Sequence, residues 1–382
     1  MTKPYIDFYK QHNISPVSQN IDDIQKHFER RAAMYRHMGI VPSSLKDRRV
    51  IEFGPGSGFN SLHTNSLKPS LYLLVDGNPT GAQKTSELLN KYYPDSVNYN
   101  VIESLIEEYK TNELFDFVIC EGVIPNQNNP STFLKHVASF VDLGGVLMIS
   151  CADSVSTLAD NIRRVLADIK VPSNLPLKER ISKLCLYYSV DIKNLKGMSR
   201  PAEDWVLDNI IQPISSHGPL LSIADAIEAI SETFEIHGTS PKFFIDWRWY
   251  KDIYNTESKY NEIGINNYKS NIHNLLDYRY FARPLDFQLN IEILQAADKI
   301  RAHCQDYELD PKVEILFSIC YNLLIIKEII VDLLPETATC LEEVSYSIDC
   351  YAKGGGLQDL KLFPHLFGRG QQYVSFIRKD NV

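Results

Sequence analysis

Short apolar runs alternate with amphipathic segments along residues 49–150. Five runs have the length and composition of buried strands, at residues 49–54, 70–76, 97–102, 115–120 and 145–150. Four segments between them have helical spacing, at residues 59–67, 79–92, 104–110 and 131–141. Strands that alternate with helices in this way indicate a parallel sheet covered on both faces, with right-handed crossovers.

The pattern changes after Cys151. Residues 152–220 are mostly helical and are broken by several prolines, and 222–234 predict one more amphipathic helix. Extended segments are expected at 234–238 and 242–247, and residues 256–345 are again helical. The chain closes with alternating polar and apolar positions at 372–378, which predict a strand.

An amphipathic helix is expected ahead of the first strand, over residues 21–38. Its apolar positions include Ile24, Phe28 and Tyr35, which share one helical face. Asn20 is a suitable N-cap and Gly39 a suitable end.

The turn after the first strand reads Glu52-Phe53-Gly54-Pro55-Gly56-Ser57-Gly58. Its glycines allow a tight turn and close contact with a ligand. The second strand ends in Asp76, which is suited to accept both hydroxyls of a ribose. A dinucleotide fingerprint needs G-x-G-x-x-G, and here Phe59 stands where the third glycine would be. Glu52 would repel a pyrophosphate, whereas it suits a cationic ligand.

This E-x-G-x-G-x-G turn, followed by a strand ending in Asp76-Gly77-Asn78, resembles the class I S-adenosylmethionine (SAM)-dependent methyltransferases. Residues 204–250 and 367–378 show a weaker resemblance to a bacterial subgroup of these methyltransferases that has a large helical insertion. The resemblance implies an α/β fold: a Rossmann-like seven-stranded sheet, parallel with an antiparallel edge strand, plus a helical cap formed by insertions. Strands six and seven of that fold form a hairpin, which we assign to 234–238 and 372–378.

The expected domain organisation follows from this assignment. Its parts are an N-terminal helical lid (1–48), the SAM-binding core (49–151), a helical insertion (152–220), a core helix with strand six (221–250), a helical cap (251–362) and the final core strand (363–382). The N-terminal helix either packs into the core or covers the cofactor. As a lid, it would bring Arg31, Tyr35 or Arg36 to the methionine carboxylate.

The resemblance also implies which residues bind SAM. We expect the cofactor-binding residues to be Glu52, Gly54, Gly56, Gly58, Asp76, Asn78, Glu103, Ser104 and Cys120. Among them, Asp76 would hold the ribose and Asn78 would add a second contact. Glu103 and the Ser104 backbone N–H would lie near the adenine. Glu103 also suits a helix N-terminus, where an acid is favoured by the dipole. Glu52 would orient the turn or reach the methionine ammonium through its neighbours.

Catalytic and substrate residues are less specified. Glu121, at the tip of the fourth strand, is a candidate general base or amine-binding acid, and a structural role is equally open. Asp246 is the second catalytic candidate. His237, Trp247 and Arg248 are candidates for a substrate wall, the alternative being a structural hinge. Methyl transfer depends largely on alignment and exclusion of water, so no catalytic triad is required.

The charge and the cysteine content of the chain limit which kinds of binding partner we expect. The 382 residues carry a net charge of −9 and no long Lys/Arg run, which argues against nucleic acid, as does the absence of a D/N-P-P-Y/F signature after strand four. Seven scattered cysteines without a C-x-x-C pair indicate neither disulfides nor a metal site, and fit the cytoplasm. We expect a small-molecule methyl acceptor and no membrane partner; a homodimer stays open.

Three other functions are alternatives for a chain with this pattern of strands and helices. An NAD-dependent oxidoreductase would need the dinucleotide spacing that is missing here. A non-catalytic SAM-fold protein would bind a partner through its helical cap. A polyamine synthase would need an acidic catalytic signature that we do not find. The sequence therefore favours a SAM-dependent methyltransferase acting on an O or N atom of a small or medium-sized metabolite.

Overall fold

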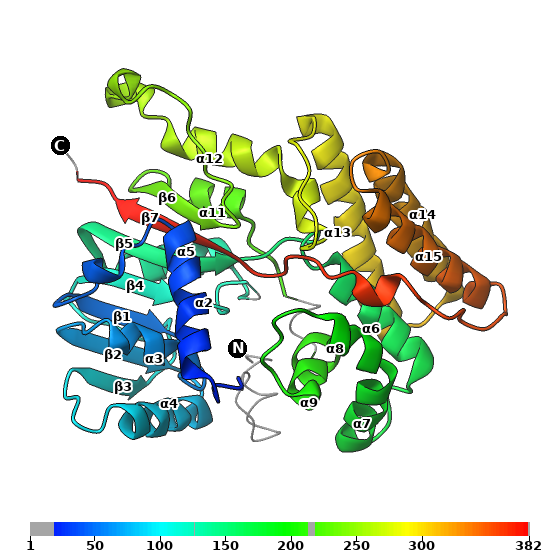
Figure 1. The fold of residues 1–382 in the computed structure, drawn as a ribbon, viewed down its shortest axis with the longest axis horizontal. Helices are drawn as coiled ribbons and strands as arrows, with labels where there is room; N and C mark the ends of the chain where they lie inside the picture. The colour runs from blue at the N-terminus through cyan, green and yellow to red at the C-terminus, as the bar shows by residue number, and fades with distance from the viewer. Residues whose placement is uncertain (1–18, 126, 213–217, 381–382) are drawn as a thin grey trace. The chain divides into compact units, whose positions relative to one another are not determined.

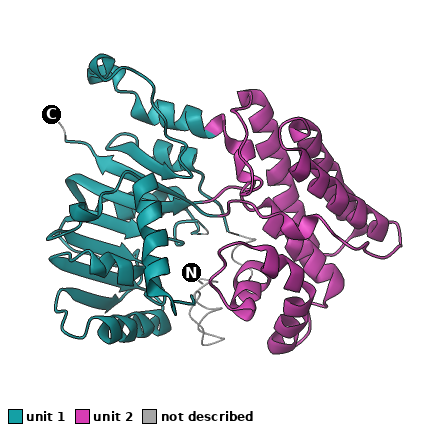
Figure 2. Ribbon diagram, in the orientation of Figure 1, with its two compact units in different colours: residues 1–151, 218–268, 371–382 teal, residues 152–217, 269–370 magenta. Residues whose placement is uncertain are grey.

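A computed structural model describes residues 19–125, 127–212 and 218–380. These residues form two compact units, which Figure 2 colours separately. Unit 1 holds the described parts of 1–151, 218–268 and 371–382, and unit 2 those of 152–217 and 269–370. Against the expected domains, 251–268 group with unit 1 and 363–370 with unit 2. Residues 1–18 of the expected lid and 213–217 of the expected insertion lie outside the described residues.

Unit 1 is built on a seven-stranded sheet (Figure 1). Its strands are β1 (Arg49–Phe53), β2 (Leu71–Asp76), β3 (Tyr99–Glu103), β4 (Phe115–Cys120), β5 (Val141–Cys151), β6 (Phe234–Ser240) and β7 (Gln372–Arg378). Their order is β3-β2-β1-β4-β5-β7-β6, and only β7 runs antiparallel to its neighbours. The predicted Rossmann-like sheet is thereby confirmed, with the antiparallel strand one position inside the edge that β6 forms.

Two local expectations were wrong. Residues 104–110 form turns instead of a helix, with hydrogen bonds that reach back only to Leu105 and Ile106. The fifth strand begins at Val141 instead of 145, because Val141 pairs with Phe115 across an irregularity in the β4–β5 ladder.

Helices cover both faces of the sheet. The helices of unit 1 are α2 (Ile24–His37), α3 (Phe59–Ser66), α4 (Pro79–Tyr92), α5 (Pro130–Ala138), α11 (Ile223–Ile230) and α12 (Tyr260–Lys269), with short turns η1 (Pro42–Ser44), η3 (Tyr250–Asp252) and η4 (Asn255–Glu257). Tyr35 of α2, Leu62 of α3 and Leu89 of α4 share one core cluster with Val50. Phe53 points to the opposite face, because side chains alternate along a strand, and it contacts Phe140 after α5.

Helix α2 is tied to the sheet and to α3. It begins at Ile24 with Asp23 as its N-cap, not Asn20. Near its other end, the Ser375 hydroxyl of β7 donates to the Met38 carbonyl at 2.7 Å. Between these ends the Tyr35 and Thr64 hydroxyls hydrogen-bond at 3.2 Å. The helix that precedes the first strand is therefore positioned partly by the last one.

Glu52 lies inside the sheet core, not on its surface. Its side chain is buried under α3 and accepts hydrogen bonds from the hydroxyls of Ser61 and Tyr72. Burial raises the pKa of Glu52 to about 7, and the nearby negative charge of Glu121 adds to the shift. Glu52 therefore gains or loses its charge near neutral pH.

Unit 2 is helical. Its elements are α6 (Leu158–Lys170), α7 (Leu177–Tyr187), α8 (Ser189–Asn194), α9 (Ala202–Val206), η2 (Leu207–Ile211), η5 (Ile272–Leu275), α13 (Phe287–Leu309), α14 (Val313–Ile330), α15 (Pro335–Ala352) and η6 (Phe363–His365). Helices α13, α14 and α15 pack against one another, and α6 packs against α13. Within the described ranges, none of the helices in either unit has both the length and the apolar character needed to cross a membrane.

A fully buried arginine organises the middle of unit 2. Arg163 of α6 donates from Nε to Asp191 at 2.9 Å and from Nη2 to the Leu366 carbonyl at 2.8 Å. Its guanidinium lies 3.9 Å from the ring centroid of Phe367, which also contacts Trp205. Trp205 and Phe367, which come from the two segments that resemble the bacterial subgroup, thus belong to one structural core.

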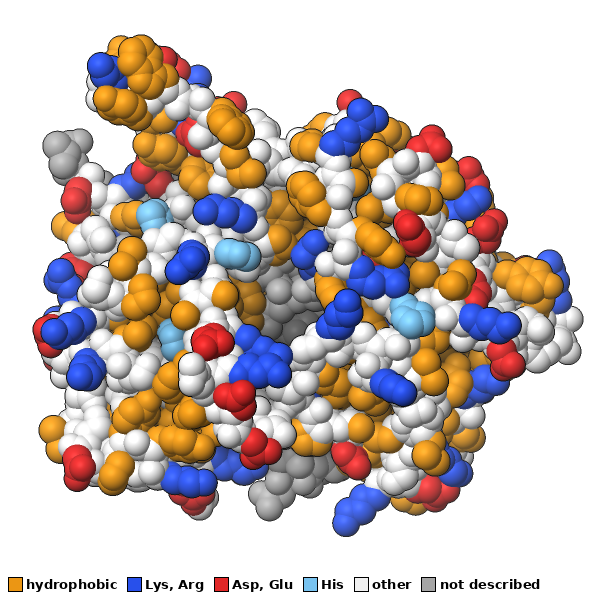
Figure 3. Space-filling model, viewed as in Figure 1, with side chains coloured by type: hydrophobic (Ala, Val, Ile, Leu, Met, Phe, Trp, Pro, Cys, Tyr) orange, Lys and Arg blue, Asp and Glu red, His pale blue; other side chains and the backbone are white. Residues whose placement is uncertain are grey.

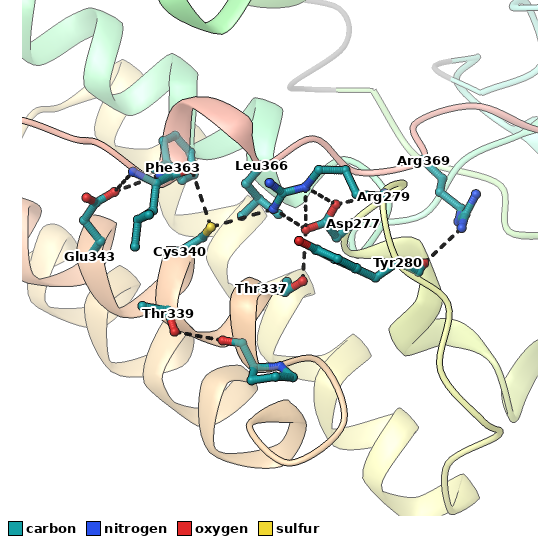
Figure 4. Close-up of polar contacts among 12 residues, drawn as sticks. Asp277, Arg279, Tyr280, Thr337, Thr339, Cys340, Glu343, Phe363, Leu366 and Arg369 are labelled. Atoms are coloured by element: carbon teal, nitrogen blue, oxygen red, sulfur yellow. Dashed lines mark hydrogen bonds and ion pairs between the residues drawn. The ribbon is translucent and has the colours of Figure 1, made fainter. Parts of the chain in front are cut away.

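Polar contacts fasten the chain segment 361–370 to the helices (Figure 4). The Glu343 carboxylate of α15 accepts three backbone N–H groups, from Lys361, Leu362 and Phe363, each at 2.8 Å. Arg369 donates to the carbonyls of Asn274 and Tyr280. A Cβ at Gly368 would lie 2.0 Å from the Ser156 carbonyl oxygen, so only glycine fits between these backbones.

Figure 4 also shows a buried charge beside this segment. Arg279 pairs with Asp277 at 2.7 Å, and the Thr337 hydroxyl of α15 donates to the same carboxylate at 2.9 Å. The Asp277 side chain is fully buried and is satisfied by these donors. The contact joins the loop after η5 to α15.

We predict that Arg163→Ala lowers the free energy of unfolding by about 3–5 kcal/mol, because Asp191 then becomes an unpaired buried charge. Denaturant unfolding measures the change. Lys183→Ala is the control, since Lys183 forms an exposed ion pair with Glu179 and its loss should cost at most about 1 kcal/mol. Equal effects of the two substitutions would contradict the role of Arg163.

We predict that Glu52→Gln stabilises the protein increasingly as pH rises. The folded state keeps a proton on Glu52 up to about pH 7, whereas the unfolded state releases it near the ordinary glutamate pKa of 4.5. Wild-type stability therefore falls as pH rises through this window, by up to about 3 kcal/mol, and the glutamine variant avoids the loss. Thermal unfolding between pH 4.5 and 8 (about the range of these pKa values) tests this. The exposed Glu103→Gln should follow the wild-type curve.

Candidate active site

The glycine turn after β1 is held open by its backbone conformation. Gly54, Gly56 and Gly58 have φ angles of 71°, 61° and 77°, in the region that favours glycine. A Cβ at Gly54 would lie 2.3 Å from Val123, whereas one at Gly56 would have no heavy atom within 4 Å. Gly58 is the N-cap of α3. The backbone at Gly56 thus faces open space, as contact with a ligand requires.

Asp76 at the tip of β2 joins this turn. One carboxylate oxygen accepts the Gly56 N–H at 2.9 Å and the other accepts the Asn78 N–H at 2.7 Å. Burial raises the pKa of Asp76 to about 6, and the two N–H donors oppose that shift. The acid and the turn, separated by a helix in the sequence, meet at one place.

Asn78 leaves a buried donor unused. Its Oδ1 accepts the Thr80 N–H and caps α4, whereas its Nδ2 is buried and has no partner among the described residues. Leaving such a donor unpaired costs about 1–3 kcal/mol. An oxygen-rich ligand at this position would relieve that cost.

The tip of β3 lies beside Asp76 in the parallel ladder, where Glu103 is its register partner. The Glu103 side chain is exposed, so it is accessible to a ligand. The backbone N–H of Ser104 donates to the Asp76 carbonyl at 3.0 Å, and the Ser104 hydroxyl bonds the carbonyl of Leu105. The expected N–H of Ser104 is therefore already engaged by the protein.

At the tip of β4, Glu121 forms a bidentate ion pair with Arg31 of α2. Arg31 Nη1 donates to Oε2 at 2.8 Å and Nη2 donates to Oε1, and both side chains are largely buried. Asn60 of α3 donates to Oε2 as well, at 3.2 Å. Arg31 Nε is buried without a partner among the described residues. The pair fastens α2 across the strand ends.

The neighbours of Glu121 are placed by the sheet. Cys120 is fully buried, and burial raises the pKa of its thiol. Its side chain lies in the core, so only its backbone is left for a ligand. Gly122 has a φ of 71° and donates its N–H to the Ser150 hydroxyl at 2.7 Å. Glu52 lies below the turn with Ser61 and Tyr72, so it supports the turn from inside.

The structure does not bring the remaining candidates to the strand ends. Asp246 is bound by Arg248, whose Nη2 lies 2.7 Å from Oδ2, and the proximity of Arg248 holds the pKa of Asp246 below its usual value. Trp247 between them is 94% exposed. His237 on β6 is exposed and hydrogen-bonds the Gly39 carbonyl. These residues lie on β6 or after it, and β6 is the edge strand farthest from β3.

Sequence reasoning missed the pairing of Arg31 with Glu121 and the contribution of Asn60. A signal was present, since Arg31 shares the buried face of α2 with His27 and Tyr35 at a spacing of four residues. A charged residue on an apolar helix face predicts a buried partner. The identity of that partner depends on the fold. Arg36, the alternative lid residue, is exposed.

A family model described as a methyltransferase domain matches residues 25–195. The ubiquinone biosynthesis O-methyltransferase of Rickettsia canadensis is 29% identical over 128 residues, covering 30% of this chain and 54% of its own length. The chain thus spans about half the length of this curated relative.

Two solved structures illustrate the similarity. The N-methyltransferase NodS of Bradyrhizobium japonicum, solved with S-adenosyl-L-homocysteine (SAH), is 17% identical with a TM-score of 0.32, covering 39% of this chain and 74% of its own. The magnesium protoporphyrin IX methyltransferase of Synechocystis, solved with bound SAH, is 15% identical with a TM-score of 0.36, covering 62% and 88%.

The matched family range begins in α2 and includes the glycine turn, Asp76 and the strands β1–β5. It therefore contains every element from which the site is built. The cofactor of this family is SAM. Residues 25–195 thus match a methyltransferase domain, and the order of the seven-stranded sheet agrees with the fold expected of a class I SAM-dependent methyltransferase.

Proposed function

We propose that this protein transfers the methyl group of SAM to an oxygen or nitrogen atom of a small or medium-sized metabolite. The observation that carries the proposal is the hydrogen bond between the Gly56 N–H and the Asp76 carboxylate. It brings the glycine turn and the acid that a nucleoside needs into contact. The family match supports the reaction, and the acidic surface argues against a nucleic-acid acceptor.

The residues present fit the cofactor. Asp76 would accept the ribose hydroxyls, and the unpartnered Nδ2 of Asn78 would donate to an oxygen of the same sugar. Gly56 leaves room for close approach, since a Cβ there meets no neighbour. Glu103 is accessible for an adenine amino group. When bound, SAM supplies a methyl group on a cationic sulfonium, which departs as a neutral thioether.

Arg31 and Glu121 match the two charges of an amino acid. Arg31 would bind a carboxylate through the guanidinium, whose Nε is buried and unpartnered. Glu121 would bind an ammonium group, from the cofactor or from an amine acceptor. Both oxygens of Glu121 already accept hydrogen bonds from Arg31, so it acts as a base only when that contact is released. We therefore assign the main catalytic contribution to alignment and exclusion of water.

We predict that Asp76→Ala weakens SAH binding by about 1–3 kcal/mol, roughly 5- to 150-fold, because the ribose loses its acceptor. Isothermal calorimetry on folded protein measures this. Asp95→Ala removes an exposed acid and serves as the control. The proposal fails if wild-type protein binds no SAH, or if Asp76→Ala binds it as tightly as wild type.

We predict that Arg31→Met weakens SAH binding by about 1.5–3 kcal/mol, roughly 10- to 150-fold, through loss of a charged hydrogen bond. Binding of 5′-methylthioadenosine should stay unchanged, because that ligand lacks the amino-acid end. Arg36→Met, on the same helix and exposed, is the matched control. A parallel loss for both ligands would mean that Arg31 only positions α2.

A further inference from the structure

A short segment after β6 exposes an unusual number of large hydrophobic side chains. We call residues 245–254 the aromatic tip. Its exposed members, with their exposed fractions, are Ile245 (50%), Trp247 (94%), Trp249 (61%), Tyr250 (71%) and Tyr254 (64%). The third tryptophan of the chain, Trp205, is buried in unit 2. Aromatic side chains gathered on one exposed loop mark an interaction surface.

The aromatic tip has a fixed frame. Arg248 holds Asp246 in a two-bond contact and also donates to the carbonyls of Glu257 and Ser258. At the base of the tip, Phe243 is buried and packs against the ring of Tyr268 at 5.7 Å. The exposed rings therefore stand on an ordered support.

The polar groups of this frame are turned inward. The Arg248 guanidinium, which would otherwise bind a protein partner, is occupied by an acid and two carbonyls of its own segment. The exposed groups that remain are mainly the aromatic rings, with Lys251 and Asp252 as the charged side chains beside them. Lys251 lies 5.1 Å from the ring centroid of Trp249 and 6.0 Å from that of Tyr250. The aromatic tip therefore presents aromatic rings to a binding partner, with the Lys251 ammonium beside them.

Charge separates this segment from the rest of the chain. The aromatic tip contains two basic and two acidic side chains and so has no net charge, whereas the whole chain carries −9. Tryptophan and tyrosine with neighbouring lysine are the side chains that favour the headgroup region of a bilayer. Anionic lipid would repel the acidic remainder of the chain but not this neutral tip, where the Lys251 ammonium beside the rings is the group that it attracts.

The aromatic tip also projects from unit 1. Figure 1 shows the turns after β6 extending beyond the sheet, and Figure 3 shows hydrophobic side chains gathered on that projection. A flat protein interface needs about 800 Å² on each partner, whereas a projecting loop suits insertion into a headgroup layer. β6 lies five strand positions from β2, roughly 24 Å at the usual strand spacing, so the tip is remote from Asp76.

We propose that the aromatic tip docks the protein on the surface of a lipid bilayer containing anionic lipids. Trp247 and Trp249 enter the headgroup region, and Lys251 meets the lipid phosphates. Arg248 and Asp246 keep the loop in shape without leaving an unpaired charge to bury. From the sequence we expected no membrane partner, and this surface contact departs from that expectation. It does not depend on the proposed reaction.

Co-sedimentation of the full chain with vesicles of phosphatidylcholine and phosphatidylglycerol tests the proposal. We expect the wild type to bind and its tryptophan emission to shift to the blue. Trp247→Ala and Trp249→Ala should each weaken binding about tenfold, since each removes one aromatic side chain from the interface. Lys251→Gln should weaken binding to these vesicles but not to vesicles of phosphatidylcholine alone.

Phe281→Ala is the matched control, because Phe281 is 76% exposed and lies outside the aromatic tip. It should bind vesicles as the wild type does, and circular dichroism should show that all variants fold. Absence of vesicle binding by the wild type overturns the proposal. So does binding that the tryptophan substitutions leave intact. A wild-type oligomer that these substitutions dissociate would instead assign the aromatic tip to self-association, and would also overturn it.

Discussion

The site depends on one hydrogen bond, from the Gly56 amide to the Asp76 carboxylate. The bond closes a loop between the first and second strands and fixes the turn with its backbone open to a ligand. The same bond helps to explain how the Asp76 carboxylate can be buried and still be oriented for a ligand. Two N–H groups hold its oxygens, while the neighbouring Asn78 amide keeps an unused donor beside it. The carboxylate is thus oriented before any ligand arrives, which limits the entropy lost on binding.

Helix α2 supplies the second half of the site. Its Arg31 reaches Glu121 across the strand ends, and its far end is held by Ser375 of β7. A buried ion pair is costly unless both partners are satisfied. Asn60 adds a further donor to the Glu121 carboxylate, whereas Arg31 Nε has no partner among the described residues. The arrangement presents opposite charges next to each other, as an amino-acid zwitterion requires. The proposed recognition of the amino-acid end of SAM therefore depends on the same two side chains that join α2 to the tip of β4.

Much of the fold was predictable from local pattern. The strands β1, β2, β4 and β7 and the helices α3 and α4 fall within a residue or two of their expected ends, because period and turn residues agree there. The family assignment followed from the turn and Asp76. The subdivision of the helical part was less predictable, since it depends on contacts between distant segments, such as Arg163 with Leu366.

The site residues that could be predicted are those at the ends of strands, because the position of a strand end follows from the sequence pattern. Asp76 and Glu121 lie where the strand tips place them, but the partner of Glu121 comes from a helix ninety residues earlier in the chain. The engagement of the Ser104 amide by Asp76 is a register effect of the β2–β3 ladder. For the segment around Trp247 the sequence left a substrate wall and a structural hinge both open, because aromatic composition alone does not distinguish a ligand wall from an exposed loop.

The position of β7 has a consequence for biosynthesis. Residues 372–378 lie between β5 and β6 and hydrogen-bond both of them, so neither strand has its final neighbour until β7 has left the ribosome. By then the helical segments of unit 2 have already been made. The edges of β5 and β6 stay unpaired during that interval, and truncation of the chain before residue 372 would leave them exposed permanently.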